Sequence, residues 1–210
     1  MNEFEKYRAD REHLMYYRYI DMLLFALTQS ASSIIDVGSN GMPVLEPLTW
    51  IKKRHSLDME NPYQSGKVLG IKENFYTFQA SERYSFATCF QVLEHLDEPK
   101  LFCEKLFDIA DDVLISVPYE WPKGHYKWHL NDPVTHESLK EWTGRDPAYF
   151  IIVEELFVGV KRCIYYYPHN SGLFSLAEAN ATMLSALNAS RQKRKLFFHR
   201  GYQKNKITTL

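Results

Sequence analysis

Hydrophobic and polar positions along this chain follow two different spacings, which predict alternating strands and helices. Short apolar runs, typical of buried parallel strands, predict strands at residues 34–37, 84–92 and 113–117. A weaker run at residues 55–59 predicts a strand that ends at Asp58. Residues 68–71 are also apolar and predict a strand whose boundaries stay open.

Helices are predicted where apolar residues recur at steps of three or four positions. The first covers residues 4–28, and the second begins at Pro47 and runs to about Arg54. A third opens at Asp97-Glu98-Pro99, with an acidic cap and a proline in its first turn. It is expected to bury four apolar side chains, those of Leu101, Phe102, Leu106 and Ile109.

The pattern closes with a helix that Thr135 caps and Gly144 ends, followed by two strands at residues 149–157 and 162–167. Gly159 lies between these strands, which predicts a hairpin. Strands that alternate with helices predict a mostly parallel α/β sheet with helices on both faces. The hairpin makes the last strand antiparallel to the others.

Composition narrows the functional classes. The chain has 210 residues and a formal net charge of −1, so nothing draws it as a whole toward nucleic acid or an anionic membrane. Its three cysteines have no zinc spacing and are expected to be thiols of a reduced compartment. Neither a signal peptide nor a membrane span is predicted, so a cytoplasmic protein is expected.

The most informative stretch is residues 33–41, which reads S-I-I-D-V-G-S-N-G. An apolar strand ends there in an acid, Asp36, and in a tight turn that contains Gly38, Asn40 and Gly41. Glycine accepts positive φ and lets a ligand approach the backbone closely, and asparagine is the next most tolerant residue. Open α/β sheets build cofactor crevices from strands that end in this way.

Four segments in order resemble the class I S-adenosylmethionine (SAM) dependent methyltransferases: D-V-G-S-N-G, S-L-D-M-E, F-Q-V-L-E-H-L-D-E-P and L-I-S-V-P-Y. The third segment is typical of one large branch of that family. The resemblance implies a Rossmann-like seven-stranded sheet with an antiparallel last strand. It divides the chain into a helical lid at residues 1–32, a SAM-binding domain at residues 33–168 and a helical, basic extension at residues 169–210.

The resemblance also assigns cofactor contacts. Asp36 would meet the ammonium of SAM, and the turn of Gly38, Asn40 and Gly41 would offer N–H groups to its carboxylate. Asp58 follows Asp36 by about 20 residues, the distance at which an acid reaches ribose hydroxyls in dinucleotide folds. Four further positions complete the set: Met59 packing on adenine, Asn74 at the adenine amino group, and Gln91 and Val92 at the methionine end.

Methyl transfer needs an aligned acceptor, and an alcohol acceptor needs a base, for which His129 or His95 is predicted. Some relatives with E-x-x-E-H after the fourth strand hold a divalent ion. Gln91 replaces the first of those acids, which weakens a site for a hard cation, and no metal is expected. The aromatic loop at residues 119–133 favours a small-molecule or glycan hydroxyl as acceptor.

Alternatives remain open at this level. Asn40 and Met42 stand where the family most often has glycine, which favours a degenerate methyltransferase fold that acts as a non-catalytic binding or scaffold module. A nicotinamide-dependent oxidoreductase would carry a fuller G-x-G-x-x-G loop. The basic tail from Arg191 contains Leu196, Phe197 and Phe198, which favours packing, including on a second copy in a homodimer, over binding to RNA.

Overall fold

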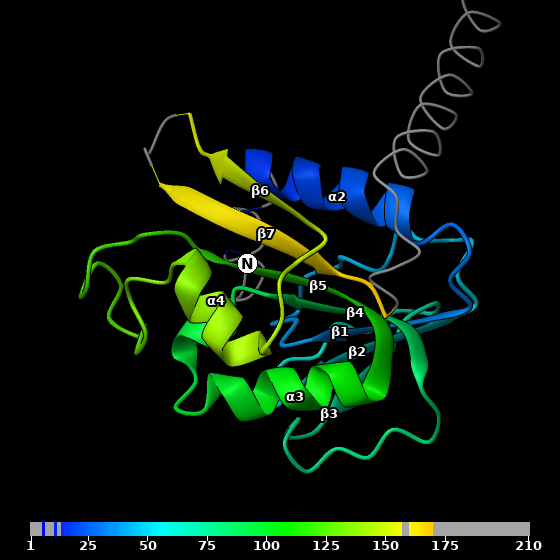
Figure 1. Cartoon of the computed structure of the whole chain (residues 1–210). Helices are drawn as coiled ribbons and strands as arrows, with labels where there is room; N and C mark the ends of the chain where they lie inside the picture. Colours follow the sequence, from blue (N-terminus) through cyan, green and yellow to red (C-terminus); the bar gives the residue numbers. More distant parts are fainter. Residues whose placement is uncertain (1–5, 7–10, 12–13, 157–159, 170–210) are drawn as a thin grey trace, which may run out of the picture. The chain divides into compact units, whose positions relative to one another are not determined.

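A seven-stranded sheet forms the centre of the protein. The computed structural model describes residues 6, 11, 14–156 and 160–169. Strand order is β3-β2-β1-β4-β5-β7-β6, and β7 runs antiparallel to both of its neighbours (Figure 1). The strands are β1 (Ser33–Val37), β2 (Lys53–Asp58), β3 (Leu69–Lys72), β4 (Tyr84–Phe90), β5 (Ala110–Pro118), β6 (Tyr149–Glu154) and β7 (Lys161–Tyr167). The predicted fold class, including the antiparallel last strand, is confirmed.

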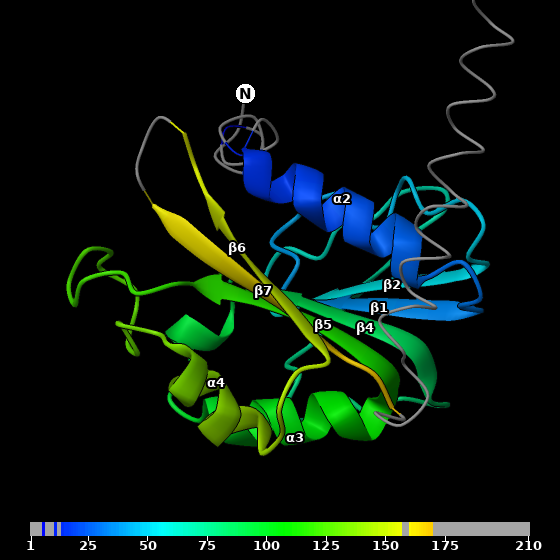
Figure 2. The ribbon, with the colours of Figure 1, turned by 45° about the horizontal axis from the view of Figure 1, so that its top comes forward.

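Helices cover both faces of this sheet. The helix α2 (Met15–Leu27) lies on one face, and α3 (Pro99–Ile109) and α4 (His136–Thr143) lie on the other (Figure 2). A short 3-10 helix, η1 (Leu93–His95), follows β4. Within the described residues, no helix is both long and apolar enough to cross a membrane.

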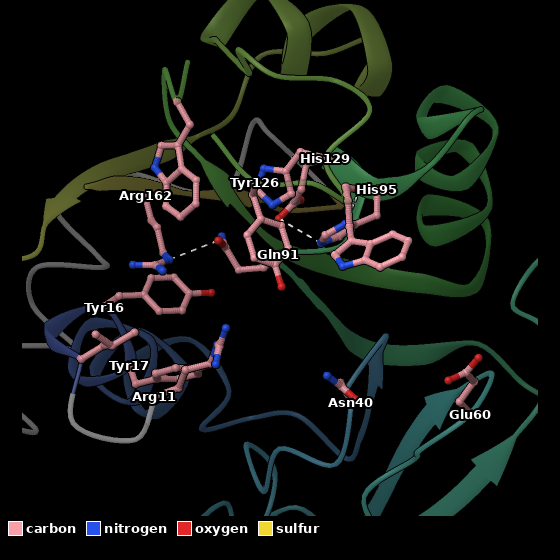
Figure 3. Close-up of a pocket in the computed structure, with 14 residues that line it drawn as sticks. Arg11, Tyr16, Tyr17, Asn40, Glu60, Gln91, His95, Tyr126, His129 and Arg162 are labelled. Atoms are coloured by element: carbon pink, nitrogen blue, oxygen red, sulfur yellow. Dashed lines mark hydrogen bonds and ion pairs between the residues drawn. The ribbon is translucent and has the colours of Figure 1, made fainter. Parts of the chain in front are cut away.

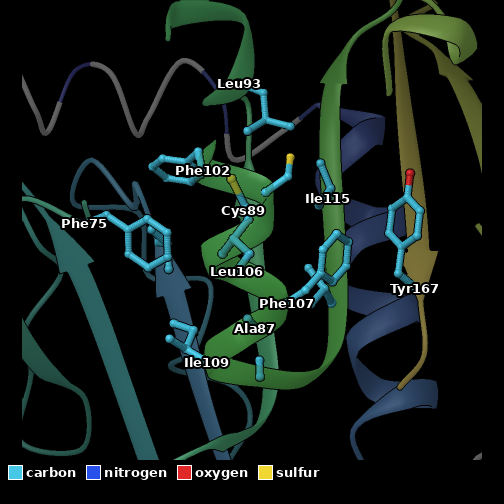
Figure 4. Close-up of a cluster of buried hydrophobic side chains, with 14 of the residues drawn as sticks. Phe75, Ala87, Cys89, Leu93, Phe102, Leu106, Phe107, Ile109, Ile115 and Tyr167 are labelled. Carbon is cyan, nitrogen blue, oxygen red and sulfur yellow. The ribbon is translucent and has the colours of Figure 1, made fainter. Parts of the chain in front are cut away.

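The main core lies between the sheet and α3. Phe102, Cys103 and Leu106 of α3 are buried against Ala87 and Cys89 of β4 (Figure 4). Burial of this apolar surface stabilises the sheet by about 25 cal/mol for each Å² removed from water. The core therefore fixes the positions of the ends of β4 and β5, where the loops with polar side chains begin.

The structure corrects the prediction for α3 in two details. The helix begins at Pro99 as expected, but the side chain of Glu98 makes no capping hydrogen bond. Leu101 is 47% exposed, because its neighbours Phe102 and Leu106 occupy the face that meets the sheet. Helix α4 agrees with its prediction: Thr135 and Ser138 form a capping box, and Gly144 ends the helix in the left-handed conformation.

The predicted helix over residues 47–54 is wrong. This segment contains turns, and β2 already begins at Lys53. Leu45, Leu48 and Ile51 are buried at three-residue steps, which imitates a helical period. Pro43 and Pro47 cannot donate backbone hydrogen bonds, so a regular helix cannot form in so short a connection.

At the N-terminus, α2 occupies part of the predicted range 4–28 and buries Tyr16, Ile20, Leu23 and Leu24. Most of the positions before residue 14 lie outside the described residues. The same is true of the predicted C-terminal extension beyond His169, and so of its helix and its basic tail.

Candidate functional site

Two adjoining pockets lie at the carboxyl ends of the central strands. The chain runs outward from β1 to β2 and β3 and then returns to β4 on the other side of β1. Open α/β sheets bind ligands at such a switch point. One pocket has a volume of about 220 Å³ and the other about 570 Å³, and they share Tyr17, Asn40, Gln91 and His95.

The smaller one, here called the glycine-loop pocket, is lined by Asp36, Gly38, Asn40, Asp58, Gln91 and Val92. The sequence predicted all six as cofactor contacts. Asp36 is the penultimate residue of β1 and is only 2% exposed, and Thr88 on β4 donates a hydrogen bond to its Oδ1 at 2.7 Å. Burial raises the pKa of Asp36 to about 7. A cation that entered the pocket would therefore stabilise the ionised form of Asp36.

Asp58 connects the loop after β1 to the loop after β2 through hydrogen bonds. Its Oδ2 accepts a hydrogen bond from the N–H of Asn40, and its Oδ1 accepts from the N–H groups of Glu60 and Asn61. The turn-anchoring role therefore accounts for most of the hydrogen bonds of this carboxylate. Asp58 also lines the pocket, so a ligand hydroxyl would add to bonds that already exist.

The turn after β1 has the backbone that the sequence predicted. Gly38, Asn40 and Gly41 all have positive φ, at 79°, 44° and 72°. A Cβ built on Gly38 would overlap the side chain of Val92, and one on Gly41 would overlap the amide of Asn61. At both glycines, a side chain of the protein itself therefore occupies the space that a Cβ would need.

The three remaining predicted contacts, Gly41, Met59 and Asn74, do not line this pocket. Met59 is 61% exposed and lines neither pocket. Asn74 also lines neither, and its side chain accepts the N–H of Tyr76 in a local turn. Their contacts with adenine stay predictions.

The larger one, here called the histidine pocket, brings together both histidines predicted to be catalytic. Their ring centroids are 4.8 Å apart, and Figure 3 shows the two rings at one wall of the pocket. His95 Nδ1 lies 2.9 Å from the carbonyl oxygen of Trp128, and His129 Nδ1 lies 2.7 Å from Oδ2 of Asp132. Because both partners accept, each Nδ1 carries a proton, and in the neutral form of each ring Nε2 keeps a lone pair.

Glu94 completes this wall. One ligand atom from each of Glu94, His95 and His129 lies within 4.8 Å of the others. Glu94 is fully buried, and neither of its carboxylate oxygens has a hydrogen-bond partner within the described part of the chain. Burial raises its pKa to about 8. Three donor atoms that converge in this way, one of them unpaired, are suited to a cation.

Sequence reasoning missed the group that orders the opposite wall. Arg162 Nε donates to Oε1 of Gln91 at 3.1 Å, and its Nη1 lies 3.7 Å from Glu155 (Figure 3 shows the Gln91 bond). Glu155 in turn accepts the N–H groups of Met15 and Tyr16 and so caps α2. Residues this far apart in the chain give no spacing signal. The positive φ of Gln91, 57°, is also invisible in the sequence.

Aromatic rings close the histidine pocket. Trp121 stacks on His129 at 5.5 Å between ring centroids, and Tyr126 lies 4.9 Å from the same ring. Trp128 is 62% exposed at the rim. On the other side, Tyr16 and Tyr17 of α2 face the pocket (Figure 3). The walls are thus suited to a planar or carbohydrate ligand.

No known family profile matches the chain, and no curated protein is detectably related to it in sequence. Solved structures are similar in fold. An N-methyltransferase, NodS from Bradyrhizobium japonicum WM9 with bound S-adenosyl-L-homocysteine (SAH), aligns with a TM-score of 0.62 at 10% identity. The alignment covers 77% of this chain and 90% of that one.

The 1,6-didemethyltoxoflavin-N1-methyltransferase of Burkholderia thailandensis also has a TM-score of 0.62, at 13% identity, over 78% of this chain and 82% of that one. A [4+2]-cyclase, SpnF, aligns with a TM-score of 0.53 at 14% identity, over 66% of this chain and 60% of that one. One fold thus carries more than one chemistry. The comparisons establish that this chain has the Rossmann-like fold of class I SAM-dependent methyltransferases.

Proposed function

We propose that this protein is a SAM-dependent methyltransferase that acts on a hydroxyl group of a small molecule or glycan. The observation that carries the proposal is the placement of Asp36 and Asp58 on one pocket that adjoins the two histidines. Asp36 would bind the ammonium group of the cofactor and Asp58 its ribose hydroxyls. The acceptor would then lie beside the cofactor, in the adjoining pocket, as methyl transfer requires.

The residues divide the work between the two pockets. Asp36, buried and close to its pKa at neutral pH, would pair with the ammonium of the cofactor. The backbone around Asn40 would face the cofactor's carboxylate, and Oδ2 of Asp58 would accept a ribose hydroxyl. When bound, SAM supplies the methyl electrophile, so the protein needs to align the acceptor and exclude water.

The acceptor would occupy the histidine pocket. Its hydroxyl would lie at His95 and His129, which line this pocket, and the Nε2 atom of either ring would activate the oxygen. Trp121 and Tyr126 would hold the flat face of a sugar or aromatic ring. The volume of about 570 Å³ is suited to a small molecule or one end of a glycan.

Isothermal titration with SAH tests the cofactor half of this proposal. We expect a single site in the full-length chain, and at least tenfold weaker binding in Asp36→Asn. Asp97→Asn, an exposed acid replaced in the same way, is the matched control and should bind as the wild type does. A folded wild-type protein that binds no SAH at high micromolar concentration would sink the proposal.

A second candidate function has one specific observation in its favour. Val92 and Asn61 occupy the space beside Gly38 and Gly41, as expected of a degenerate fold that holds no cofactor and serves as a scaffold. The same titration separates the two functions. Transfer of a labelled methyl group from SAM to a panel of glycans and phenols then identifies the acceptor.

A further inference from the structure

The guanidinium group of Arg162 lines the histidine pocket with most of its hydrogen-bond donors unused. The side chain is 12% exposed. Within the described part of the chain, it donates only one hydrogen bond, from Nε to Gln91. Nη1 is buried and has no hydrogen-bond partner among these residues, and Nη2, which also has none, remains accessible. A guanidinium has five N–H donors, so a partner that enters from the pocket would satisfy donors that the protein leaves open.

The neighbouring carboxylate of Glu155 compensates the charge of Arg162 only in part. Its Oε1 lies 3.7 Å from Nη1 of Arg162, which is beyond hydrogen-bond distance. Both oxygens of Glu155 already accept backbone N–H groups at the start of α2, Oε2 from Met15 and Oε1 from Tyr16. Arg162 therefore keeps positive charge, as well as free donors, on the side of the pocket.

Contacts within the protein fix this guanidinium in place. Alternation along β7 puts Cys163 in the core on the side of α3, so Arg162 points to the opposite face of the sheet, where α2 lies. Its Cζ lies 5.4 Å from the ring centroid of Tyr16 and 5.3 Å from that of Trp121. Nε1 of Trp121 donates to the carbonyl of Lys161, which holds the indole ring. A cation held in this way loses little freedom when an anion binds.

The other charged groups on the histidine pocket leave room for one negative charge at Arg162. Arg11 is a second guanidinium on the lining. Of the two acids on the lining, Glu60 lies far from Arg162 (Figure 3). The other is Glu94, whose pKa burial raises to about 8, so it is mostly uncharged at neutral pH. A guanidinium that is partly compensated by Glu155 matches a singly charged carboxylate better than a doubly charged phosphate.

We propose that the histidine pocket binds a hydroxy acid, whose carboxylate pairs with Arg162 while its hydroxyl lies at the histidines. Trp121 contacts both Arg162 and His129, so a molecule with one ring and its two polar substituents is long enough to reach both. A uronic acid residue of a glycan and a hydroxylated aromatic acid share this chemistry. That the bound acid is the methyl acceptor rests on the proposed function, whereas the carboxylate site itself does not.

Matched pairs of an acid and its primary amide test this proposal, because the two molecules differ in charge but little in shape. The probes are protocatechuate with its amide and glucuronate with its amide. Calorimetry of the full-length chain, with and without SAH, should show at least one acid bound at least tenfold more tightly than its amide. The pair that shows the preference distinguishes an aromatic acid from a uronic acid.

Substitutions of Arg162 assign the preference to its side chain. Arg162→Met removes the charge with little change in volume, so the preference should fall below twofold while the affinity for the amide stays within about twofold of the wild type. Arg162→Lys keeps the charge without the planar fork and should restore part of the preference. Because Arg162→Met leaves Glu155 without a cation, the double variant Arg162→Met/Glu155→Gln removes both charges and should lose the preference as well.

Arg145→Met is the matched control. Arg145 is an exposed arginine that also lies over an aromatic ring, that of Phe107, but it lines neither pocket. This variant should bind both members of each pair as the wild type does. Far-UV circular dichroism verifies that each variant is folded.

The proposal is overturned if the folded wild type prefers neither acid over its amide, or if Arg162→Met keeps the preference. A titration of the same samples with SAH separates this result from the proposed function. Binding of SAH without a preference for either acid refutes only the carboxylate site. A preference for an acid that depends on Arg162, in a protein that binds no SAH, supports the carboxylate site and refutes only the methyltransferase proposal.

Discussion

The two pockets differ in how their carboxylates are satisfied. In the glycine-loop pocket, Asp58 accepts three backbone N–H groups and Asp36 accepts the hydroxyl of Thr88. In the histidine pocket, Glu94 is buried as Asp36 is, but its carboxylate has no hydrogen-bond partner among the described residues. The carboxylates of the first pocket are thus held by bonds within the described part of the protein, and that of Glu94 is not.

This difference distinguishes carboxylates that stabilise the fold from carboxylates that are free to bind a ligand. Bonds that the protein makes to itself, such as those of Asp58, are needed for the fold whether or not a ligand binds. Groups that remain unpaired, such as Glu94, lower stability and are retained where something else pairs with them. Substitutions in the first pocket should therefore change stability and binding together.

The largest effect is expected from Gly38→Ala. A Cβ there overlaps Val92, and the backbone has φ of 79°, which only glycine adopts without strain. The left-handed conformation costs about 1–2 kcal/mol and overpacking about 1–3 kcal/mol. We expect a loss near 3 kcal/mol in urea unfolding and no measurable binding of SAH.

The double variant Gly38→Ala/Val92→Ala sharpens this result. Removing the Val92 methyl groups relieves the overlap and leaves only the backbone strain, so about half of the lost stability should return. If the single variant unfolds like the wild type, the contact between the turn and Val92 is not a packing constraint. The claim that contacts within the protein stabilise the glycine-loop pocket would then be wrong.

The second effect in size is that of Asp58→Ala. Three backbone N–H groups lose their acceptor, which should lower the free energy of unfolding by about 2 kcal/mol. Affinity for SAH should fall at least tenfold in calorimetry. If affinity falls while stability stays at the wild-type value, Asp58 serves the ligand alone, and its hydrogen bonds to the loops contribute nothing.

Much of this could be predicted from the sequence, because period and turn chemistry are local. The strand endings at Val37 and Asp58, the cap at Thr135 and the hairpin each depend on a few neighbouring residues. The segment from Pro47 to about Arg54 was predicted as a helix that starts at the proline, and its buried Leu48 and Ile51 are spaced as they would be in one. Local pattern alone cannot distinguish the two arrangements.

The histidine pocket was harder to predict, because its parts come from distant segments. His95 and His129 were predicted as candidates. Glu94 was not, because its burial without a partner among the described residues depends on how the core encloses it. Arg162 reaches Gln91 only because β7 lies beside β5 in the register that pairs Arg162 with Pro118. Tertiary packing, rather than any motif, determines both features.

A third prediction concerns pH. Burial raises the pKa of Asp36 to about 7, and an ammonium group pairs only with its ionised form. Affinity for SAH should therefore rise as the pH rises through 7 and should fall by up to about tenfold from pH 8 to pH 6. In the ligand-free protein the raised pKa has the opposite consequence. The unfolded chain loses the Asp36 proton at a lower pH than the folded protein does, so the free energy of unfolding falls as the pH rises from about 4 to about 7.

Calorimetry of Asp36→Asn over the same range isolates this group. Asp58 and His95 line the same pocket and remain in the variant, so the difference between the two curves belongs to Asp36. The variant should bind weakly and with a flatter pH profile. An unchanged slope would assign the pH dependence to those neighbours and would remove Asp36 from the ammonium site.

The smallest effect is expected from Thr88→Val, which keeps the shape of the side chain and deletes one hydrogen bond. Thr88 Oγ1 donates to Asp36 at 2.7 Å in a buried position, so stability should fall by about 1 kcal/mol. The lost bond stabilised the ionised acid, so the midpoint of SAH binding should move to higher pH. Affinity well above that midpoint should change little. Thr49→Val, at an exposed threonine that lines neither pocket, is the matched control and should leave both quantities unchanged. A variant whose midpoint stays at the wild-type pH would mean that burial alone governs the pKa of Asp36, and that this pocket supports its acid no better than the other supports Glu94.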